Sequence, residues 1–246
     1  MDDYHVITAS NGLAAQKMIK NNLPDIILCD VLMPKMNGFQ FCTALKKNIE
    51  TCHVPIILFS GLGSKENIMQ GLECGADDYI VKPYDYELLL SKIQGFLHNR
   101  QVLKRKFLLF TEAEEEIQFS NELDDKFIAN LTQLVEDNLS DPNFTIKDMC
   151  EAMGMSRTSF YHKLKALMDV SPNEFLRTIR LKKGRRMLLE HDYNVSEVAY
   201  NVGFSDAKYF GTLFKKYYGE NPSSFVANKR KNQSKDQTIP SGEDKE

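Results

Sequence analysis

Three polar side chains of different chemical types stand at the ends of short apolar segments in the first hundred residues. Asp30 and Ser60 each end such a segment, and Lys82 directly follows one. A carboxylate oxygen can act as a nucleophile, and an ammonium group can neutralise negative charge that develops beside it. In a parallel sheet the working residues lie at the carboxyl ends of the strands, so we expect these three side chains to meet.

The elements that must position these side chains alternate along the chain. Short apolar or β-branched runs, which predict strands, are each followed by a segment with helical character. Such alternation indicates an α/β fold, a parallel sheet with helices on both faces. The expected strands are Tyr4–Ala9, Asp25–Asp30, Val54–Ser60 and Asp78–Val81, and the expected helices are 11–20, 36–48, 63–73 and 85–97.

Residues 4–97 resemble the response-regulator receiver domain, which has a flavodoxin-like, doubly wound sheet. The motifs are Met-Pro-Lys-Met-Asn-Gly after Asp30, Gly-Ala-Asp-Asp-Tyr, and Lys-Pro. The resemblance implies that Asp30 accepts a phosphoryl group from a histidine kinase and that Ser60 and Lys82 bind the phosphoryl oxygens. It also implies that Tyr79 swings inward as the hydroxyl moves, and that the Lys82–Pro83 peptide is cis. The alternative, in which Asp30 only caps a turn and Lys82 is a surface charge, leaves the three motifs unexplained.

The family's first strand, which ends in two adjacent acidic residues, and its first helix have no counterpart in this sequence. Asp2 and Asp3 precede Tyr4, so they fall before the second strand and are not the acidic pair. Only Asp30 and a backbone carbonyl near Leu32 remain for Mg²⁺, which requires an octahedral set of oxygen ligands. We therefore expect a truncated receiver with an incomplete metal site, weak or absent Mg²⁺ binding, impaired phosphorylation of Asp30, and an open sheet edge at 25–30.

An internal repeat marks the second half of the chain, where the segment that starts at Thr145 returns 49 positions later at Asn194. Each copy opens with a capping box, Thr145 with Asp148 and Asn194 with Glu197, and has apolar residues at helical spacing. Two helices joined by a tight turn form the helix-turn-helix motif, in which the second helix enters the DNA major groove. Each copy has a glycine that ends the first helix and a serine that can cap the second: Gly154 and Ser156, then Gly203 and Ser205.

A stiff helix is predicted between the two units, at Pro172–Glu190, with Ser171 as its cap. About 18 residues at 1.5 Å each make a rod of roughly 27 Å. Such a rod can hold two recognition helices about one DNA turn apart, ~34 Å, on one face of the duplex.

Residues 127–225 resemble the DNA-binding domain of the AraC/XylS family. The motifs include Ser-Pro-Asn-Glu-Phe-Leu-Arg, Ser-Glu-Val-Ala-Tyr-Asn-Val-Gly-Phe-Ser-Asp and Gly-Glu-Asn-Pro. The resemblance implies an all-α, double helix-turn-helix domain of seven helices that binds double-stranded DNA. A receiver followed by this module resembles the C-terminal end of the hybrid two-component regulators of Bacteroidetes. That likeness implies a transcription factor switched by phosphorylation, with a histidine kinase domain as partner and a homodimer on DNA.

The recognition helices are expected at 156–167 and 206–217. At His162, where relatives often carry arginine, a phosphate or solvent contact remains open as an alternative to base reading. The expected core residues are Phe160, Leu164 and Leu167 in the first helix, and Tyr209, Phe210, Leu213 and Phe214 in the second. The residues expected to contact DNA are Arg157, Thr158, Tyr161, His162 and Lys165, then Ala207, Lys208, Gly211 and Thr212, with Lys215 and Lys216 placed for phosphates.

The net charge of −3 conceals a local basic field. Between residues 156 and 186, only Asp169 and Glu174 oppose the positive charges, and local fields rather than the total decide phosphate contact. A solvated helix face is the alternative explanation. The basic residues of this stretch are Arg157, Lys163, Lys165, Arg177, Arg180, Lys182, Lys183, Arg185 and Arg186.

The remaining features bound the functional class. The five cysteines lack CxxC or zinc spacing, which is typical of a reduced, cytoplasmic protein, and no apolar run reaches the ~18 residues that span a bilayer. We expect no enzyme, because Leu32 stands where Asp-x-Asp phosphatases carry their second aspartate. The alternative function is a protein-interaction module whose damaged receiver titrates a kinase or partner. The expected division is a receiver at 1–98, a linker at 99–126, a DNA-binding domain at 127–225 and a disordered tail at 226–246.

Overall fold

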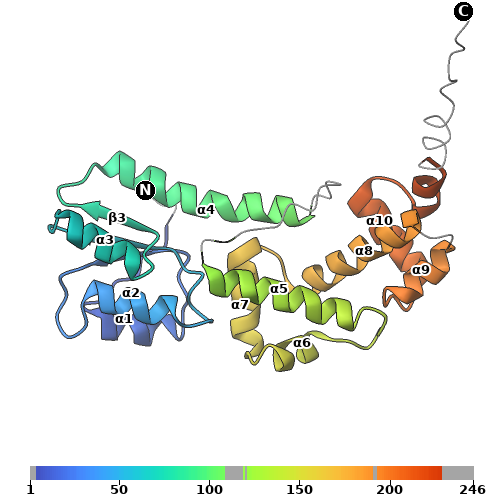
Figure 1. Cartoon of the computed structure of the whole chain (residues 1–246), viewed down its shortest axis with the longest axis horizontal. Coiled ribbons are helices and arrows are strands. Elements are labelled where there is room, and N and C mark those ends of the chain that lie inside the picture. Colours follow the sequence, from blue (N-terminus) through green and yellow to red (C-terminus); the bar gives the residue numbers. More distant parts are fainter. Residues whose placement is uncertain (1–3, 109–118, 120, 191–192, 229–246) are drawn as a thin grey trace, which may run out of the picture. The chain divides into compact units, whose positions relative to one another are not determined.

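The computed structural model describes residues 4–108, 119, 121–190 and 193–228. The chain divides into two compact units, and Figure 1 labels most of their helices and strands. The first unit comprises Met1–Asn130 and Gly154–Pro172, and the second comprises Leu131–Met153 and Asn173–Glu246. Most of the tail expected at 226–246 lies outside the described residues.

A parallel sheet organises the receiver part of the first unit. Strands β1 (Ile27–Asp30), β2 (Ile56–Ser60) and β3 (Asp78–Val81) pair in the order β1-β2-β3. Helices α1 (Gly12–Ile19), α2 (Gly38–Lys46) and α3 (Lys65–Glu73) alternate with the strands, and α4 (Tyr86–Leu108) follows β3. The predicted α/β alternation is therefore confirmed, and apart from the end of α4 the ends of these strands and helices lie within a few residues of those expected.

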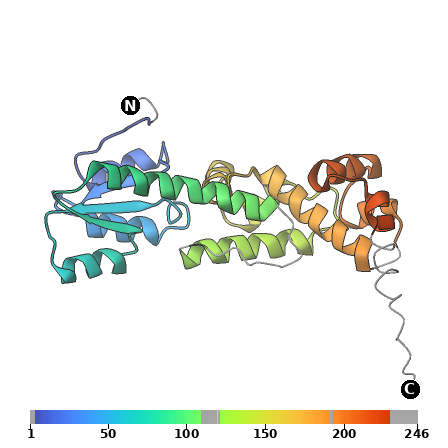
Figure 2. The same ribbon diagram turned by 90° about the horizontal axis from the view of Figure 1, so that it is seen from above.

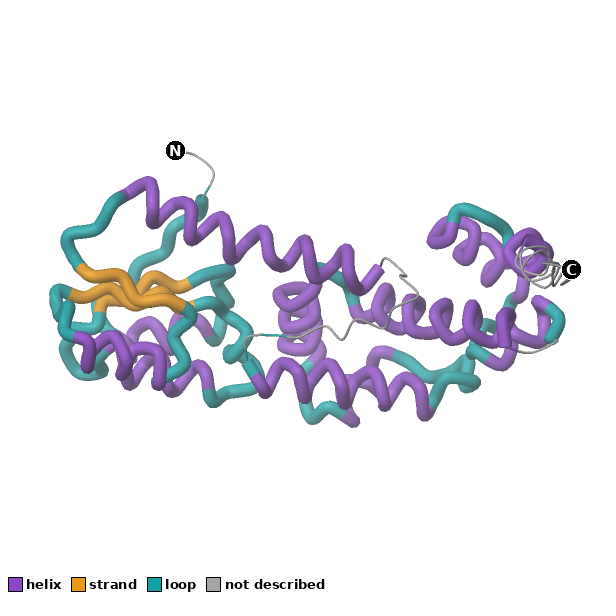
Figure 3. Tube along the Cα trace, turned by 45° about the horizontal axis from the view of Figure 1, so that its top comes forward, coloured by secondary structure: helices purple, strands orange, loops and turns teal. Residues whose placement is uncertain are grey.

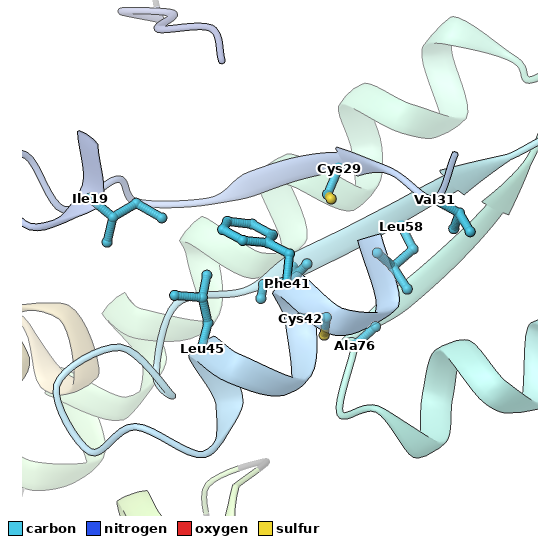
Figure 4. Close-up of a cluster of buried hydrophobic side chains, with 9 residues drawn as sticks. Ile19, Cys29, Val31, Phe41, Cys42, Leu45, Leu58 and Ala76 are labelled. Atoms are coloured by element: carbon cyan, nitrogen blue, oxygen red, sulfur yellow. The ribbon is translucent and has the colours of Figure 1, made fainter. Parts of the chain in front are cut away.

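The central strand β2 has apolar side chains on both faces, as expected for a strand covered by helices on both sides. On one face, Leu58 packs with Phe41 of α2 in a core that also takes in α1 (Figure 4). On the other face, Ile57 packs with Leu89 and Ile93 of α4. Figure 3 shows α4 on the opposite side of the sheet from α1, α2 and α3. The two cores fix the sheet, and with it the strand ends that carry the polar residues.

The strand expected at Tyr4–Ala9 is not formed, which corrects the sequence prediction. These residues pair with no strand of the described chain, and Val6 is 76% exposed. A β-branched run becomes a strand only where a neighbour satisfies its backbone N–H and C=O groups. Within the described residues β1 pairs with β2 alone, so the open edge expected at 25–30 is confirmed, and Leu28 there is 46% exposed.

Helix α4 is longer than expected. It runs unbroken to Leu108, well past the predicted end near residue 97 (Figure 2). Phe107 near its end is buried, and α4 contacts α7 (Arg157–Met168), a helix distant in the sequence. The segment expected as a linker at 99–126 therefore begins as helix, and α5 (Glu122–Asp137) begins before it ends.

The repeat predicted from the sequence appears as two pairs of helices. The first pair is α6 (Ile146–Ala152) and α7, and the second is α9 (Val195–Asn201) and α10 (Ala207–Tyr218). Both predicted capping boxes are present, and the two turn glycines have positive φ, 64° and 79°. Helix α8 (Pro172–Glu190) stands between the pairs in the sequence, and a further helical segment lies at 222–228.

Candidate phosphoacceptor site and nucleic-acid interface

Asp30 and Lys82 meet at the carboxyl end of the sheet. Asp30 is the last residue of β1, and the Lys82 Nζ atom lies 2.6 Å from its Oδ2 atom. The backbone N–H of Leu32 donates to the other carboxylate oxygen at 3.1 Å. Both charged side chains keep about two-fifths of their surface, 40% for Asp30 and 44% for Lys82. A reagent in solution can therefore reach the carboxylate.

The charge state of Asp30 follows from these contacts. Desolvation acts to raise the pKa of the carboxyl, but the hydrogen bonds from Lys82 and from the Leu32 amide outweigh it, and the net shift is downward. Asp30 is thus held as the anion, the form in which an oxygen can act as a nucleophile.

Backbone geometry aims Lys82 at Asp30. The Lys82 N–H donates to the carbonyl of Ser60 at 2.8 Å, which continues the β2–β3 ladder beyond β3. The Lys82–Pro83 peptide is cis, as the receiver resemblance implies. The ladder bond fixes the point at which Lys82 leaves the sheet beside β2, and from there its side chain reaches Asp30 at the end of β1.

Ser60 and Tyr79 converge on one residue, Leu62, which the sequence did not reveal. The buried Ser60 Oγ atom accepts a hydrogen bond from the Leu62 N–H at 3.0 Å. The Tyr79 hydroxyl donates to the Leu62 carbonyl at 2.9 Å, while its ring packs against the core around α1 and α2. The two residues that the family likeness assigns to switching are therefore both hydrogen-bonded to the backbone of Leu62, Ser60 through the N–H group and Tyr79 through the carbonyl.

The described residues do not fit an octahedral Mg²⁺ site. No group of three or more His, Cys, Asp or Glu that could hold a metal is found in the part of the chain that the structure describes. Asp30 is the carboxylate at this point of the sheet, and its oxygens already accept from Lys82 and Leu32. One carboxylate is too few for the ligand set that Mg²⁺ requires.

Helix α7 separates into a buried and an exposed face, as the sequence predicts for a recognition helix. Ser156 caps it, accepting from the Ser159 N–H at 3.1 Å. Phe160, Leu164 and Leu167 are buried, as expected. The five residues expected to contact DNA are all exposed: Arg157, Thr158, Tyr161, His162 and Lys165.

Two residues of the predicted basic field are not on the surface. Lys163 is fully buried and forms an ion pair with Asp124 of α5. Arg180 is 8% exposed, and its guanidinium donates to the Asp141 carbonyl at 2.6 Å. Neither can supply charge to a phosphate, so the basic field is smaller than the sequence count implies.

Helix α10 has the same length as α7 but starts 50 positions later, whereas the preceding helices repeat at 49. The extra residue moves the cap from the expected Ser205 to Asp206, whose side chain accepts from the Lys208 N–H at 2.7 Å. It also turns Tyr209 outward, to 46% exposed, which corrects its predicted place in the core.

The other side chains of α10 divide between the core and the surface. Phe210, Leu213 and Phe214 are buried. Ala207 and Gly211 are half-buried, and an added Cβ at Gly211 would have no atom within 4 Å. The exposed face is Lys208, Tyr209, Thr212, Lys215 and Lys216. Tyr209 is therefore a surface aromatic that joins the predicted DNA-contacting residues.

No described helix is long and apolar enough to cross a membrane.

Two protein families match the two halves of the chain separately. Residues 1–94 match the response regulator receiver domain family, and residues 149–228 match a helix-turn-helix domain family. Across nearly the whole chain, the sequence is 37% identical to histidine kinase P4 of Formosa agariphila over 224 residues, which is 91% of this chain and 16% of that protein. The chain thus spans about a sixth of that relative's length.

Two further similarities cover one or both halves. The transcriptional regulatory protein HptR of Staphylococcus aureus is 24% identical over 229 residues, 91% of this chain and 88% of that protein. The C-terminal domain of the response regulator YesN from Fusobacterium nucleatum, a solved structure, is 27% identical with a TM-score of 0.39, covering 41% of this chain and 98% of its own. By the two family matches, the chain carries a response regulator receiver domain at residues 1–94 followed by an AraC-type helix-turn-helix domain at residues 149–228.

Proposed function

We propose that this chain is a transcription regulator that reads DNA sequence through α7 and α10 and is controlled through Asp30 of its receiver. The observation that carries the proposal is the exposed face of α7, where five polar side chains stand opposite three buried apolar ones. A helix with this division can pack on its own domain and still place side chains in the major groove.

The two helices differ in what they offer to DNA. On α7, Arg157, Thr158 and His162 carry long or hydrogen-bonding groups suited to base edges. On α10, Gly211 and Thr212 are small, while Lys215 and Lys216 are exposed cations suited to phosphates. We propose that α7 supplies most of the sequence preference and α10 most of the sequence-independent affinity.

Asp30 is proposed as the phosphoacceptor, with Lys82 and Ser60 holding the phosphoryl oxygens and Tyr79 as the switch residue. The carboxylate is ionised and accessible, and its neighbour Lys82 carries the charge that would meet the phosphoryl group. Mg²⁺ would assist such a transfer, but the described residues do not fit an octahedral Mg²⁺ site, so no step is assigned to the metal.

The proposed partners follow from the two domains. A histidine kinase domain would supply the phosphoryl group, and double-stranded DNA is the ligand of the helix-turn-helix domain. We further propose that the chain acts as a homodimer on DNA, because linking two binding modules on one site raises avidity. The chain is proposed to be a regulator without an enzymatic activity of its own.

Selection of DNA by the intact chain tests this function. A random duplex pool is enriched for binding to the full chain, and a selected duplex is compared with a scrambled one by gel shift at fixed salt. A specific regulator should prefer the selected duplex by roughly 10³-fold or more. Equal and weak binding to both duplexes would instead favour a protein-interaction module and would reject the proposal.

A further inference from the structure

Lys163 is the most anomalous residue of the first recognition helix. Aligned by their caps, α7 and α10 place Lys163 and Leu213 at the same position, 50 residues apart. Both are buried, but one is a charged side chain with no exposed surface at all. A buried charge is very costly unless it is paired and hydrogen-bonded, so its partners carry information.

The partners of Lys163 form one compact group, here called the Cys52–Asp124–Lys163 cluster. The Lys163 ammonium pairs with Asp124 Oδ1, lies 3.3 Å from Cys52 Sγ, and stands 5.0 Å from the centre of the Phe127 ring. The Cys52 thiol in turn donates to Asp124 Oδ1 at 3.3 Å. All three members are buried, Asp124 at 2% exposed and the other two at 0%.

The state of the thiol supports this arrangement. Burial raises the pKa of Cys52 to about 11. The thiol therefore keeps its proton and can donate it to Asp124. The carboxylate is then shared between an ammonium and a thiol donor, with no solvent to replace either.

The cluster joins the receiver to the recognition helix within the first unit. Cys52 lies in the receiver loop between α2 and β2, whereas Lys163 lies in the middle of α7. A second buried lysine fixes that loop: Lys46 Nζ donates to the Cys52 carbonyl at 3.1 Å and to the Val54 carbonyl at 3.0 Å.

Lys46 extends the contact to the start of β3. Its ammonium is 2.6 Å from Asp77 Oδ2, which also accepts from the Ile56 N–H at 2.7 Å. Asp77 directly precedes β3, the strand that carries Tyr79. Polar contacts therefore run without interruption from the switch strand of the receiver to the recognition helix.

A second charged contact holds the C-terminal end of α7. Asp169 caps that end, and its Oδ2 atom is 2.8 Å from Lys104 Nζ of α4. The helix is thus held at its middle and at its end, while its exposed face is left open.

We propose that Lys163 is a positioning residue for DNA reading, which fixes α7 against the receiver through Asp124 and Cys52. Lys163 has no exposed surface and does not itself contact DNA; it acts through Arg157, Thr158 and the other exposed residues of the same helix. The proposal rests on the proposed function, because it assigns the receiver a direct hold on the helix that reads bases.

Three variants of the full chain test the proposal. Lys163→Leu introduces the residue that α10 has at this position and leaves the Asp124 carboxylate without its ion-pair partner. Lys163→Leu with Asp124→Leu removes both charges, a replacement that buried ion pairs often tolerate without loss of stability. Lys147→Leu is the control, because Lys147 of α6 is exposed and pairs with Glu151 at the surface.

The first measurement is the alkylation rate of individual cysteines, followed by peptide mass spectrometry. Cys52 should react slowly in the wild type and roughly tenfold or more faster in Lys163→Leu, because its cluster is opened. Cys42, which is buried in the receiver core away from the cluster, should not change. Equal acceleration of both cysteines would show general unfolding and would overturn the positioning role.

The second measurement is the ratio of affinities for a duplex selected by the wild-type chain and a scrambled duplex. This ratio should fall by roughly tenfold in Lys163→Leu and in the double variant, and stay unchanged in Lys147→Leu. A double variant with the full wild-type ratio of affinities would overturn the proposal, since two leucines in place of the ion pair would then position α7 equally well. Should the wild type itself show no preference, the proposed function fails, while the Cys52 rates still decide whether Lys163 holds the receiver loop on α7.

Discussion

Single residues at the end of the sheet set the chemistry of the receiver. Asp30 is ionised, accessible and paired with Lys82, and these properties favour attack by its oxygen on a phosphoryl donor. Mg²⁺ would assist the phosphoryl transfer, but among the described residues only one carboxylate at this site could bind it. The described residues therefore provide a carboxylate and a neighbouring ammonium group, but not the set of ligands that Mg²⁺ requires.

Phosphorylation of Asp30 in this chain is therefore expected to be substoichiometric. Incubation of the chain with acetyl phosphate and Mg²⁺, followed by intact-mass measurement, should show a minor acid-labile adduct of one phosphoryl group. The adduct should be absent from Asp30→Asn and retained by Asp25→Asn, an acid at the other end of the same segment. A full, stoichiometric adduct on the wild-type chain would contradict the expectation.

Asp169 at the end of α7 gives a pH dependence with a definite sign. Hydrogen bonds from Lys104 and from Lys165 lower the pKa of its carboxyl. A carboxyl whose folded pKa is lowered stabilises the fold above its unfolded pKa and loses that contribution as the pH falls through the folded value.

Asp169→Asn should therefore lower the melting temperature at pH 7 but have little effect near pH 2. Asparagine accepts the left-handed conformation of this residue, φ 53°, so the variant removes charge and leaves the backbone unchanged. A difference in melting temperature that is the same at both pH values would show that the charge is not responsible.

Some residue assignments could be made from the sequence and others could not. Asp30 and Lys82 were predictable because strand ends in a parallel sheet meet at one edge. Tyr209 was misplaced because the repeat changes its spacing by one residue before α10, which rotates the helix register. Lys163 looked like a surface cation because its burial depends on Asp124 and Cys52, which are distant in sequence.

Among the elements, the two helix-turn-helix pairs show how local signals determine structure. Their capping boxes and turn glycines were predictable because the interacting groups lie within a few residues of each other. The strand expected at Tyr4–Ala9 failed for the opposite reason, since a strand requires a partner from elsewhere in the chain. The extra turns of α4 likewise depend on contact with α7.

The two turn glycines should respond differently to the same substitution. Both have positive φ, so alanine costs about 1–2 kcal/mol at either position. At Gly203 an added Cβ would also lie 2.3 Å from the Leu139 carbonyl oxygen, whereas at Gly154 no atom is within 4 Å. Gly203→Ala should therefore destabilise the chain by roughly 1–3 kcal/mol more than Gly154→Ala in urea unfolding, because overpacking adds to the backbone cost. Equal losses of stability in the two variants would show that the backbone around Leu139 shifts and relieves the overlap with the added Cβ atom.

At the scale of the whole molecule, the proposed function requires that two recognition helices act on one duplex. The sequence predicts that α8 spaces them by about one turn of DNA, ~34 Å. A footprint of the chain on a selected duplex should then show two protected major-groove segments about 10 base pairs apart, on the same face. Protection of a single segment would contradict the predicted spacing.

The division of labour between the helices predicts distinct effects for two exposed residues. Arg157 of α7 is exposed and is proposed to contact base edges, so Arg157→Ala should weaken binding to the selected duplex by about 1–3 kcal/mol and leave binding to scrambled DNA nearly unchanged. Lys215 of α10 is exposed and is proposed to contact a phosphate, so Lys215→Ala should weaken binding to both duplexes alike and lower the slope of log K against log salt by about 1. Gel-shift titrations at several salt concentrations measure both quantities. If Arg157→Ala weakened both duplexes equally, α7 would contact the backbone rather than the bases, and the sequence preference would have to come from α10.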